Sequence, residues 1–269
     1  MTAWLLLAPA VVFLVVVFVL PLAQVLILSV TEPSLSLANY RRVFNTPLYL
    51  HVMVTTFKTS LAVTVACLVL AYPIAYVMAR QGGTLAVVFL AAIGMAFWTS
   101  FLVRTYAWMV ILGTRGPIAA LYSALGLGPA PQWLFTTFSS TLAMTHILLP
   151  YMVMALYGVM KRIDPNHLRA AASLGARPFA GFRHVFLPLS LPGVVNGSLL
   201  VFTLCLGFFV TPVLLGSPRD MMISQLIAQQ VEELLAWGFA SALAVVLLAV
   251  TVAVMVGYNR VAGLDRLWG

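Results

Sequence analysis

The side chains of this sequence that could do acid, base or metal chemistry are few and scattered. They are four histidines and two cysteines: His51, His146, His167, His184, Cys67 and Cys205. The histidines lack metal-ligand spacing, and each cysteine lies in an apolar run without a CxxC pair, which is typical of a small packing residue. There is no GxxxxGK[ST] phosphate loop and no HExxH motif. We therefore expect no catalytic residue, metal site or cofactor in this chain, and helix packing for His146, whose place near Pro150 leaves a functional alternative open.

The carboxylates are placed outside the long apolar runs. They are Glu32, Asp164, Asp220, Glu232, Glu233 and Asp265. A proton or cation relay uses carboxylates within the membrane, where an ionisable group is costly and kept for a purpose. The sequence thus disfavours an ion-coupled secondary transporter. If the protein moves a solute, the energy comes from elsewhere.

The elements that carry these residues are predicted membrane spans. Hydrophobic residues make up 63% of the 269 residues, and the mean hydropathy is +1.08, against about 45 to 50% apolar residues in soluble domains. Because one span needs about 20 apolar residues, we expect an all-α bundle of six helices and no second, soluble domain. The approximate bounds are 4–30, 52–79, 85–110, 137–160, 191–215 and 237–258. The first span is expected to be retained rather than cleaved, with a kink near Pro21.

The basic residues of the connections predict the orientation, because cytoplasmic loops hold an excess of Lys and Arg. One side collects Arg80, Lys161, Arg162, Arg169, Arg177, Arg183, Arg260 and Arg266. The other side collects Arg41, Arg42, Arg104, Arg115 and Arg219. Both termini are therefore expected to be cytoplasmic. The net charge of +8 then reflects topology rather than nucleic-acid binding.

The connection at residues 161–190 predicts a short helix outside the lipid. Asp164 can cap free amides, and Pro165 is tolerated at the first helical position. The helix runs past Leu168 to Gly175, the residue best suited to a left-handed helix end. Ala170 to Ala172 leave a smooth surface that a partner could approach closely. A helix lying on anionic lipid headgroups is the alternative.

The second half of this connection predicts an aromatic face and a bend. Phe179, Phe182 and Phe186 space the aromatic face. Pro188 and Pro192 are expected to bend the chain before it re-enters the membrane.

The stretch "RAAASLGARPFAGFRHVFLPLSLPG" resembles the EAA loop of permease subunits of binding-protein-dependent ABC importers, with Ala170, Ala171, Gly175, Leu187 and Pro188 on motif positions. In that family the short helix docks into a cleft of a cytoplasmic ATPase and transmits nucleotide-driven closure to the spans. The resemblance implies coupling by loop 161–190 of a single permease domain, 1–269. The coupling residues would be Asp164, Pro165, Leu168, Arg169, Ala170, Ala171, Gly175, Ala176, Leu187 and Pro188.

One residue departs from the family pattern, because Arg169 replaces the acidic residue. A salt bridge from that acid to the ATPase therefore cannot be carried over, whereas docking through shape can. Arg169 could pair with an acidic residue of the ATPase, or a partner permease could make the ordinary contact.

Four further stretches of the sequence resemble one subfamily of these permeases. "NYRRVFNTPLYL", "YPIAYVMA", "FWTSFLVRTYAWMVILGTRGPI" and "LGFFVTPVLLGSPRDMMISQLIAQQV" are similar to spermidine/putrescine-type permeases. This implies the type I importer fold in a bacterial inner membrane. The implied partners are a second permease, two copies of an ATPase that carries the ATP and Mg, an extracytoplasmic binding protein and membrane lipid.

Three aromatic residues near the outer end of the third span are candidates for the substrate path: Trp98, Tyr106 and Trp108. They could hold a cationic amine by cation–π attraction, or they could mark the membrane interface. Arg104 would repel a polyamine if it faced the path, which favours packing or docking for Arg104.

The function expected from the resemblance is import of a polyamine or related cationic amine. Opines, phosphonates, iron and thiamine are alternative solutes, since permeases for them share the subfamily. A membrane scaffold or channel that holds anionic lipid with its basic loop is the alternative without transport.

Overall fold

The computed structural model describes the backbone of residues 2–262 and the side chains of residues 7–258, and this part of the chain contains helices and no strands. Asp265 and Arg266 lie outside the described residues, as does the side chain of Arg260. The chain forms two compact units, residues 1–55 with 222–254 and residues 56–221 with 255–269. Each unit is described by itself.

The first unit begins with one long apolar helix. It comprises α1 (Thr2–Leu14), a π-helical turn (Val15–Val19) and α2 (Leu20–Thr31), and Leu7–Thr31 is long and apolar enough to cross a membrane. The chain stays helical through Pro21. The irregularity lies one turn earlier, where the Leu20 N–H donates to the Val15 carbonyl in an i→i+5 bond. The π-helical turn therefore occupies the place where the sequence predicted a kink.

The other elements of this unit are α3 (Ala38–Asn45), the start of α4 (Pro47–Gln81), α13 (Ile223–Glu232) and most of α14 (Trp237–Ala262). The Arg42 guanidinium carbon lies 4.3 Å from the Phe239 ring centroid, and the Tyr49 ring lies 5.0 Å from Phe239. Gly238 must lack a side chain, because a Cβ there would overlap the carbonyl oxygen of Glu32. These contacts pin the start of α14 against α2 and α3.

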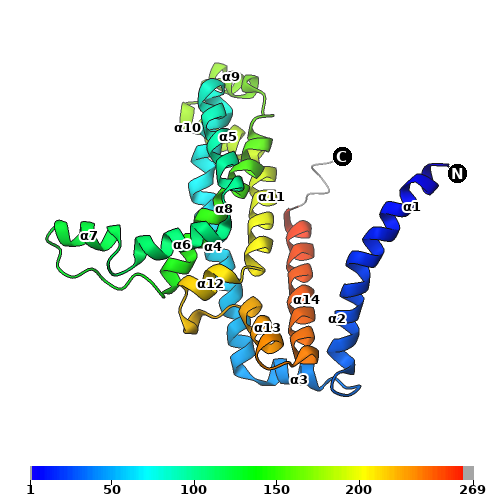
Figure 1. Cartoon of the computed structure of the whole chain (residues 1–269). Helices are drawn as coiled ribbons and strands as arrows, with labels where there is room; N and C mark the ends of the chain where they lie inside the picture. Colours follow the sequence, from blue (N-terminus) through cyan, green and yellow to red (C-terminus); the bar gives the residue numbers. More distant parts are fainter. Residues whose placement is uncertain (1, 263–269) are drawn as a thin grey trace. The chain divides into compact units, whose positions relative to one another are not determined.

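The second unit holds the remaining elements (Figure 1). They are the rest of α4, α5 (Gly83–Trp98), α6 (Phe101–Leu112), α7 (Pro117–Ala124), α8 (Thr137–Met160), α9 (Pro165–Ser173), α10 (Pro178–Gly181), a π-helical turn (Phe182–Phe186), α11 (Leu187–Leu206), α12 (Val210–Leu215) and a 3₁₀ turn (Pro218–Asp220). Its core lies along α8, on which many residues are buried.

The closest helix packing in this unit joins α8 and α11. Gly193 and Gly197 are buried on α11, and Cβ atoms built on them would meet Val159 at 3.0 Å and the Met152 Sδ at 2.8 Å. Small residues four apart let two helix backbones approach closely, as is common between membrane helices. The pair therefore sets the distance between α8 and α11.

The third predicted span, 85–110, is wrong as a single straight helix. The helix ends at Trp98 and restarts at Phe101, and the two parts form a broken pair bent by 95°. Thr99 and Ser100 have extended backbone, and the Thr99 hydroxyl donates to the Met95 carbonyl at 2.9 Å. The hydrogen bond of the Thr99 hydroxyl competes with the regular backbone bonds of the helix, which favours a break at this residue.

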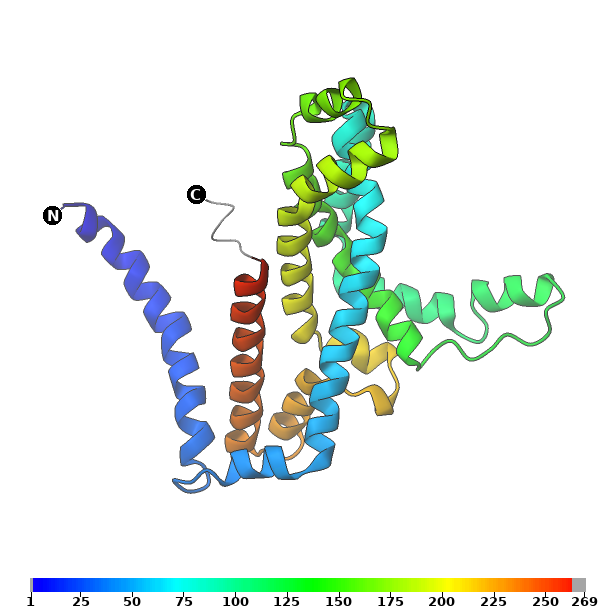
Figure 2. The same cartoon turned by 180° about the vertical axis from the view of Figure 1, so that it is seen from behind.

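The described part of the chain still contains up to six candidate crossings, five long helices and the bent pair. Figures 1 and 2 show that α4 and α8 both end beside α9, and that α5 starts at that same end. The broken pair α5–α6 must therefore carry the chain back to the other end, where α8 begins. All described carboxylates lie outside these candidate spans, as predicted.

The fifth predicted span, 191–215, has different bounds in the structure. The span is Pro178–Leu206, and Val210–Leu215 forms the separate helix α12 after Gly207. The helix does not end at Pro188 or Pro192. Pro188 lies in the first turn of α11, directly after the π-helical turn, where the Leu187 N–H donates to the Phe182 carbonyl. The expected bend before membrane entry is thus replaced by this turn.

Candidate functional site: the α9 loop and the α5–α6 cavity

The ends of α9 are formed by the residues that the sequence indicated. The Asp164 carboxylate accepts a hydrogen bond from the Asn166 N–H at 2.8 Å, and Pro165 is the first helical residue. At the other end Gly175 has φ +86°, and the N–H groups of Gly175 and Ala176 donate to the carbonyls of Ala172 and Ala171 at 2.9 and 3.0 Å. This pair of bonds is the Schellman motif. The predicted start and left-handed end of the helix are confirmed.

The surface of α9 is largely free. Arg169 and Ala170 are exposed, Ala171 is half-buried, and Leu168 reaches the backbone of α10, since a Cβ on Gly181 would lie 3.4 Å from it. Leu168 therefore seats α9 on α10. The rest of α9 remains open to a partner.

Two exposed apolar side chains follow α9. Leu174 is 89% exposed and Phe179 is 71% exposed. Large apolar side chains this exposed beside a short polar helix are typical of an interaction site. The coupling set expected from the motif did not include them, although both flank the predicted helix end.

Arg169 makes one described side-chain contact within its own helix. Its Nη1 donates to the Asn166 side-chain oxygen at 3.2 Å. Asn166 is also bound to Asp164 through its backbone. The guanidinium is therefore held over the first turn of α9, on the exposed surface.

The aromatic face predicted after α9 divides into two parts. Phe182 and Phe186 stack on each other with centroids 6.0 Å apart, and the Tyr76 ring of α4 meets them edge-on at 5.6 and 4.9 Å. Phe179 makes no described ring contact with this cluster, and most of its surface is exposed. The Tyr72 hydroxyl is 2.8 Å from the Ser190 hydroxyl. These contacts tie the end of loop 161–190, including Leu187 and Pro188, to α4.

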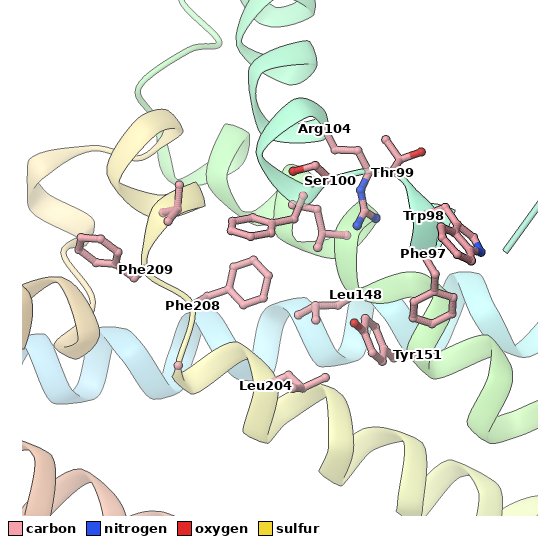
Figure 3. Close-up of a pocket in the computed structure, with 14 residues that line it drawn as sticks. Phe97, Trp98, Thr99, Ser100, Arg104, Leu148, Tyr151, Leu204, Phe208 and Phe209 are labelled. Atoms are coloured by element: carbon pink, nitrogen blue, oxygen red, sulfur yellow. The ribbon is translucent and has the colours of Figure 1, made fainter. Parts of the chain in front are cut away.

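A cavity of about 530 Å³ lies where α5 breaks from α6. We call it the α5–α6 cavity, and its walls come from three separated stretches. They are residues 97–101 with Arg104, residues 147, 148 and 151 of α8, and residues 204 and 207–210 around the end of α11. Figure 3 shows the Arg104 guanidinium extending into the space between these walls.

The three aromatic residues proposed for the substrate path do not lie together. Trp98 ends α5, lines the cavity and is 94% exposed. Tyr106 and Trp108 are on α6 outside the lining, and Tyr106 is 54% exposed. The cavity's other aromatic residues are ones that the sequence did not single out: Phe97, Phe101, Tyr151, Phe208 and Phe209.

Trp108 has a different partner. Its indole N–H donates to the Nδ1 of His146 at 3.1 Å. Nδ1 accepts this bond only when it carries no proton, so the proton of the neutral ring is on Nε2. His146 is an exposed residue of α8, one position before the lining residue Ile147. The two rings also meet edge-on with centroids 5.8 Å apart, so His146 packs α8 against α6, in agreement with the expected packing role.

Buried hydroxyl groups position the cavity walls. The Thr105 and Thr211 hydroxyls are 3.0 Å apart and link α6 to α12, and the Ser139 hydroxyl donates to the Leu215 carbonyl at 2.6 Å. An exposed link lies beside them, where the Thr137 hydroxyl donates to Asp220 at 2.6 Å. These links join residues far apart in the sequence, and no local pattern marks them. Cys67 and Cys205 are buried and free, as packing residues would be.

Comparison with known proteins identifies the family. The model of the family "Binding-protein-dependent transport system inner membrane component" matches residues 71–262. The chain belongs to this family. The permease is 36% identical to the inner membrane ABC transporter permease YdcU of Escherichia coli K12, over 76% of this chain and 68% of YdcU. It is 32% identical to the spermidine/putrescine transport system permease PotB of the same organism, over 85% of this chain and 83% of PotB.

Solved structures agree on the fold. A chain of a bacterial alginate ABC transporter, solved with a periplasmic protein bound to an alginate pentasaccharide, matches with a TM-score of 0.77 at 15% identity, over 96% of this chain and 93% of that one. The permease is thus a multi-pass inner membrane component with the type I ABC importer fold. It is not an enzyme, because ATP hydrolysis in such systems belongs to a separate subunit.

Proposed function

We propose that this permease and a second, related permease form the translocation path of an ATP-driven importer for a small solute. The solute is delivered by an extracytoplasmic binding protein, and two copies of a cytoplasmic ATPase supply the energy. Family membership supports the assembly. The observation that carries the coupling role is α9, a rigidly capped helix with an open surface and a left-handed end at Gly175.

The proposed transmission runs from loop 161–190 into the spans. Leu168 seats α9 on α10, and Phe182 and Phe186 pack on Tyr76 of α4. A displacement of α9 would therefore move α4 and α11 as packed bodies, since close-packed interiors transmit strain. Leu174 and Phe179 are the apolar contacts proposed for the ATPase. The chain, residues 1–269, is proposed to be a single transmembrane permease domain.

The proposed orientation places both termini and loop 161–190 in the cytoplasm. The bias of Lys and Arg supports this, and six crossings return the chain to the side on which it starts. Membrane lipid would then surround the exposed apolar faces of the long helices.

The proposed solute is a polyamine or related cationic amine. The support is the 32% identity to a permease named for spermidine and putrescine. Opines, phosphonates, iron and thiamine remain the alternatives within the subfamily. A scaffold or channel without transport would not need a capped helix such as α9 that presents an open surface to a partner.

The test is uptake by the complete complex in proteoliposomes, with binding protein and putrescine or spermidine outside and ATP inside. Accumulation should persist when ionophores collapse the ion gradients, because the described carboxylates lie outside the spans. It should stop when a non-hydrolysable nucleotide replaces ATP or the binding protein is omitted. Accumulation driven by an imposed ion gradient without nucleotide would overturn the proposal. A permease that purifies without an ATPase and a second permease would favour the scaffold.

A further inference from the structure

Arg104 carries a positive charge within a membrane-crossing segment. It lies on α6, one turn after the break in the bent pair. A charge at this depth is costly in lipid, so such residues face a protein interior or a water-filled cavity and usually have a partner. Arg104 lines the α5–α6 cavity, and its buried Nε has no hydrogen-bond partner among the described residues.

The cavity walls supply no compensating charge. Arg104 is the one charged side chain among the lining residues, all of which lie within the described part of the chain. The hydroxyls of Thr99, Ser100 and Tyr151 are neutral, and the remaining walls are aromatic or aliphatic. The cavity therefore presents a cationic hydrogen-bond donor in apolar surroundings, where an opposite charge would be bound strongly.

The start of α6 adds to the positive character of this space. Phe101 is the first residue of α6, and Ser100 at the N-cap makes no side-chain cap hydrogen bond. Helix N-termini carry partial positive charge and free N–H groups. Residues 99–101 line the same cavity as Arg104.

We infer that the α5–α6 cavity binds a carboxylate through the Arg104 guanidinium. The planar guanidinium matches a carboxylate with two parallel hydrogen bonds, and the aromatic walls would hold a short hydrocarbon chain attached to it. The inference rests on the proposed function, since it places this cavity on the path. The carboxylate has two chemical sources, a solute that bears one or an acidic side chain of the second permease. A free polyamine has no carboxylate, so its import would require the second source.

The first arm of the test measures binding to the purified permease pair in nanodiscs, without ATPase, binding protein or nucleotide. The probes are 4-aminobutanoate and putrescine, which share a four-carbon chain and one amine and differ in the second end group. Quenching of Trp98 fluorescence reports binding, with Trp98→Phe to identify its signal. If the solute supplies the carboxylate, 4-aminobutanoate binds saturably and Arg104→Gln weakens it by roughly 10- to 100-fold. Arg104→Lys should retain part of the affinity.

The second arm measures copurification of the two permeases. If the second permease supplies the carboxylate, Arg104→Gln lowers the recovered pair and the uptake of every solute alike, and neutralising the matching acid in the partner restores assembly. Arg115→Gln is the matched control, because Arg115 is exposed outside the cavity lining. Circular dichroism measures the helical content of each variant and so distinguishes either result from misfolding. Arg104→Lys is a second variant, which keeps the positive charge but not the guanidinium.

The inference is overturned if Arg104→Gln binds, assembles and transports like Arg115→Gln. If the proposed function is wrong, the wild-type complex will show no ATP-dependent uptake, which is a different result from a normal Arg104→Gln variant. Binding in the first arm and copurification in the second arm are measured without nucleotide, so these two readouts do not depend on that outcome.

Discussion

Loop 161–190 and the α5–α6 cavity differ in how far apart their parts lie in the sequence. The conformation of α9 is fixed within a few residues, by the Asp164 cap and the Gly175 end. The cavity needs walls from α5, α6, α8 and the end of α11. Local hydrogen bonds shape the first region, whereas helix packing shapes the second.

Because of this difference, a substitution in one region is expected to change one property of the permease and leave the other unchanged. A change in the caps of α9 should alter docking without disturbing the spans, because α9 contacts the rest of the unit mainly through α10 and the π-helical turn. A change at the α8–α11 contact should alter the cavity and leave the caps of α9 intact. Separate readouts of ATPase docking and cavity binding can test this division.

The largest expected effect is that of Gly197→Leu. A Cβ at Gly197 already approaches Met152 Sδ at 2.8 Å and Ala155 at 3.2 Å, so a leucine must push α11 away from α8, at a cost of about 1–3 kcal/mol or more. We expect a lower melting temperature in detergent and loss of Trp98 quenching. Gly158→Leu is the control, because a Cβ there meets nothing within 4 Å. Equal melting temperatures for the two variants would show that this contact does not hold the cavity.

Gly175→Val should have the next largest effect, confined to coupling. A β-branched residue at φ +86° is strained by roughly 1–2 kcal/mol, which should unwind the end of α9. Membrane level and melting temperature should stay near wild type while ATPase copurification and uptake fall about tenfold. Gly175→Asn is the control, since asparagine tolerates this conformation better. Normal uptake by the valine variant would contradict the coupling role of the loop.

Arg169→Glu tests the departure from the family motif. Arg169 is exposed and is held by Asn166 at 3.2 Å. If Arg169 faces an acidic residue of the ATPase, the substitution replaces a weak attraction between exposed charges with a repulsion. Copurification of the ATPase should therefore weaken by a few-fold. Reversing that acid should restore the complex. Arg177→Glu controls for general charge, and assembly at or above the wild-type level would mean that Arg169 makes no such pair.

The smallest expected effect is that of Asp164→Ala. Loss of the bond to the Asn166 N–H should cost about 1 kcal/mol of helix stability, which α10 and a docked ATPase partly offset. Amide exchange in residues 165–168 should accelerate, and uptake should fall by less than with Gly175→Val. Asp164→Asn should behave like wild type, because asparagine also caps. Unchanged exchange in Asp164→Ala would show that packing, rather than the cap, fixes the start of α9.

The sequence by itself determined the class, the approximate spans and α9. Long apolar runs need no tertiary information, because lipid is the solvent for each span separately. Asp164, Pro165 and Gly175 act on their own neighbours, so their spacing was sufficient. The resemblance carried by Ala170, Gly175 and Pro188 likewise depends on one contiguous stretch.

The tertiary structure alone decided the bend of 95° between α5 and α6 and the cavity beside it. Residues 85–110 are predominantly apolar on both sides of Thr99 and Ser100, so periodicity and hydropathy could not reveal that these two residues leave the helix. The Thr105–Thr211 contact and the Trp108–His146 bond join distant residues and have no signature in sequence spacing. The place of Arg104 on the wall of a cavity without a carboxylate was likewise decided by the fold, because the electric field at a side chain depends on the groups that the fold places around it.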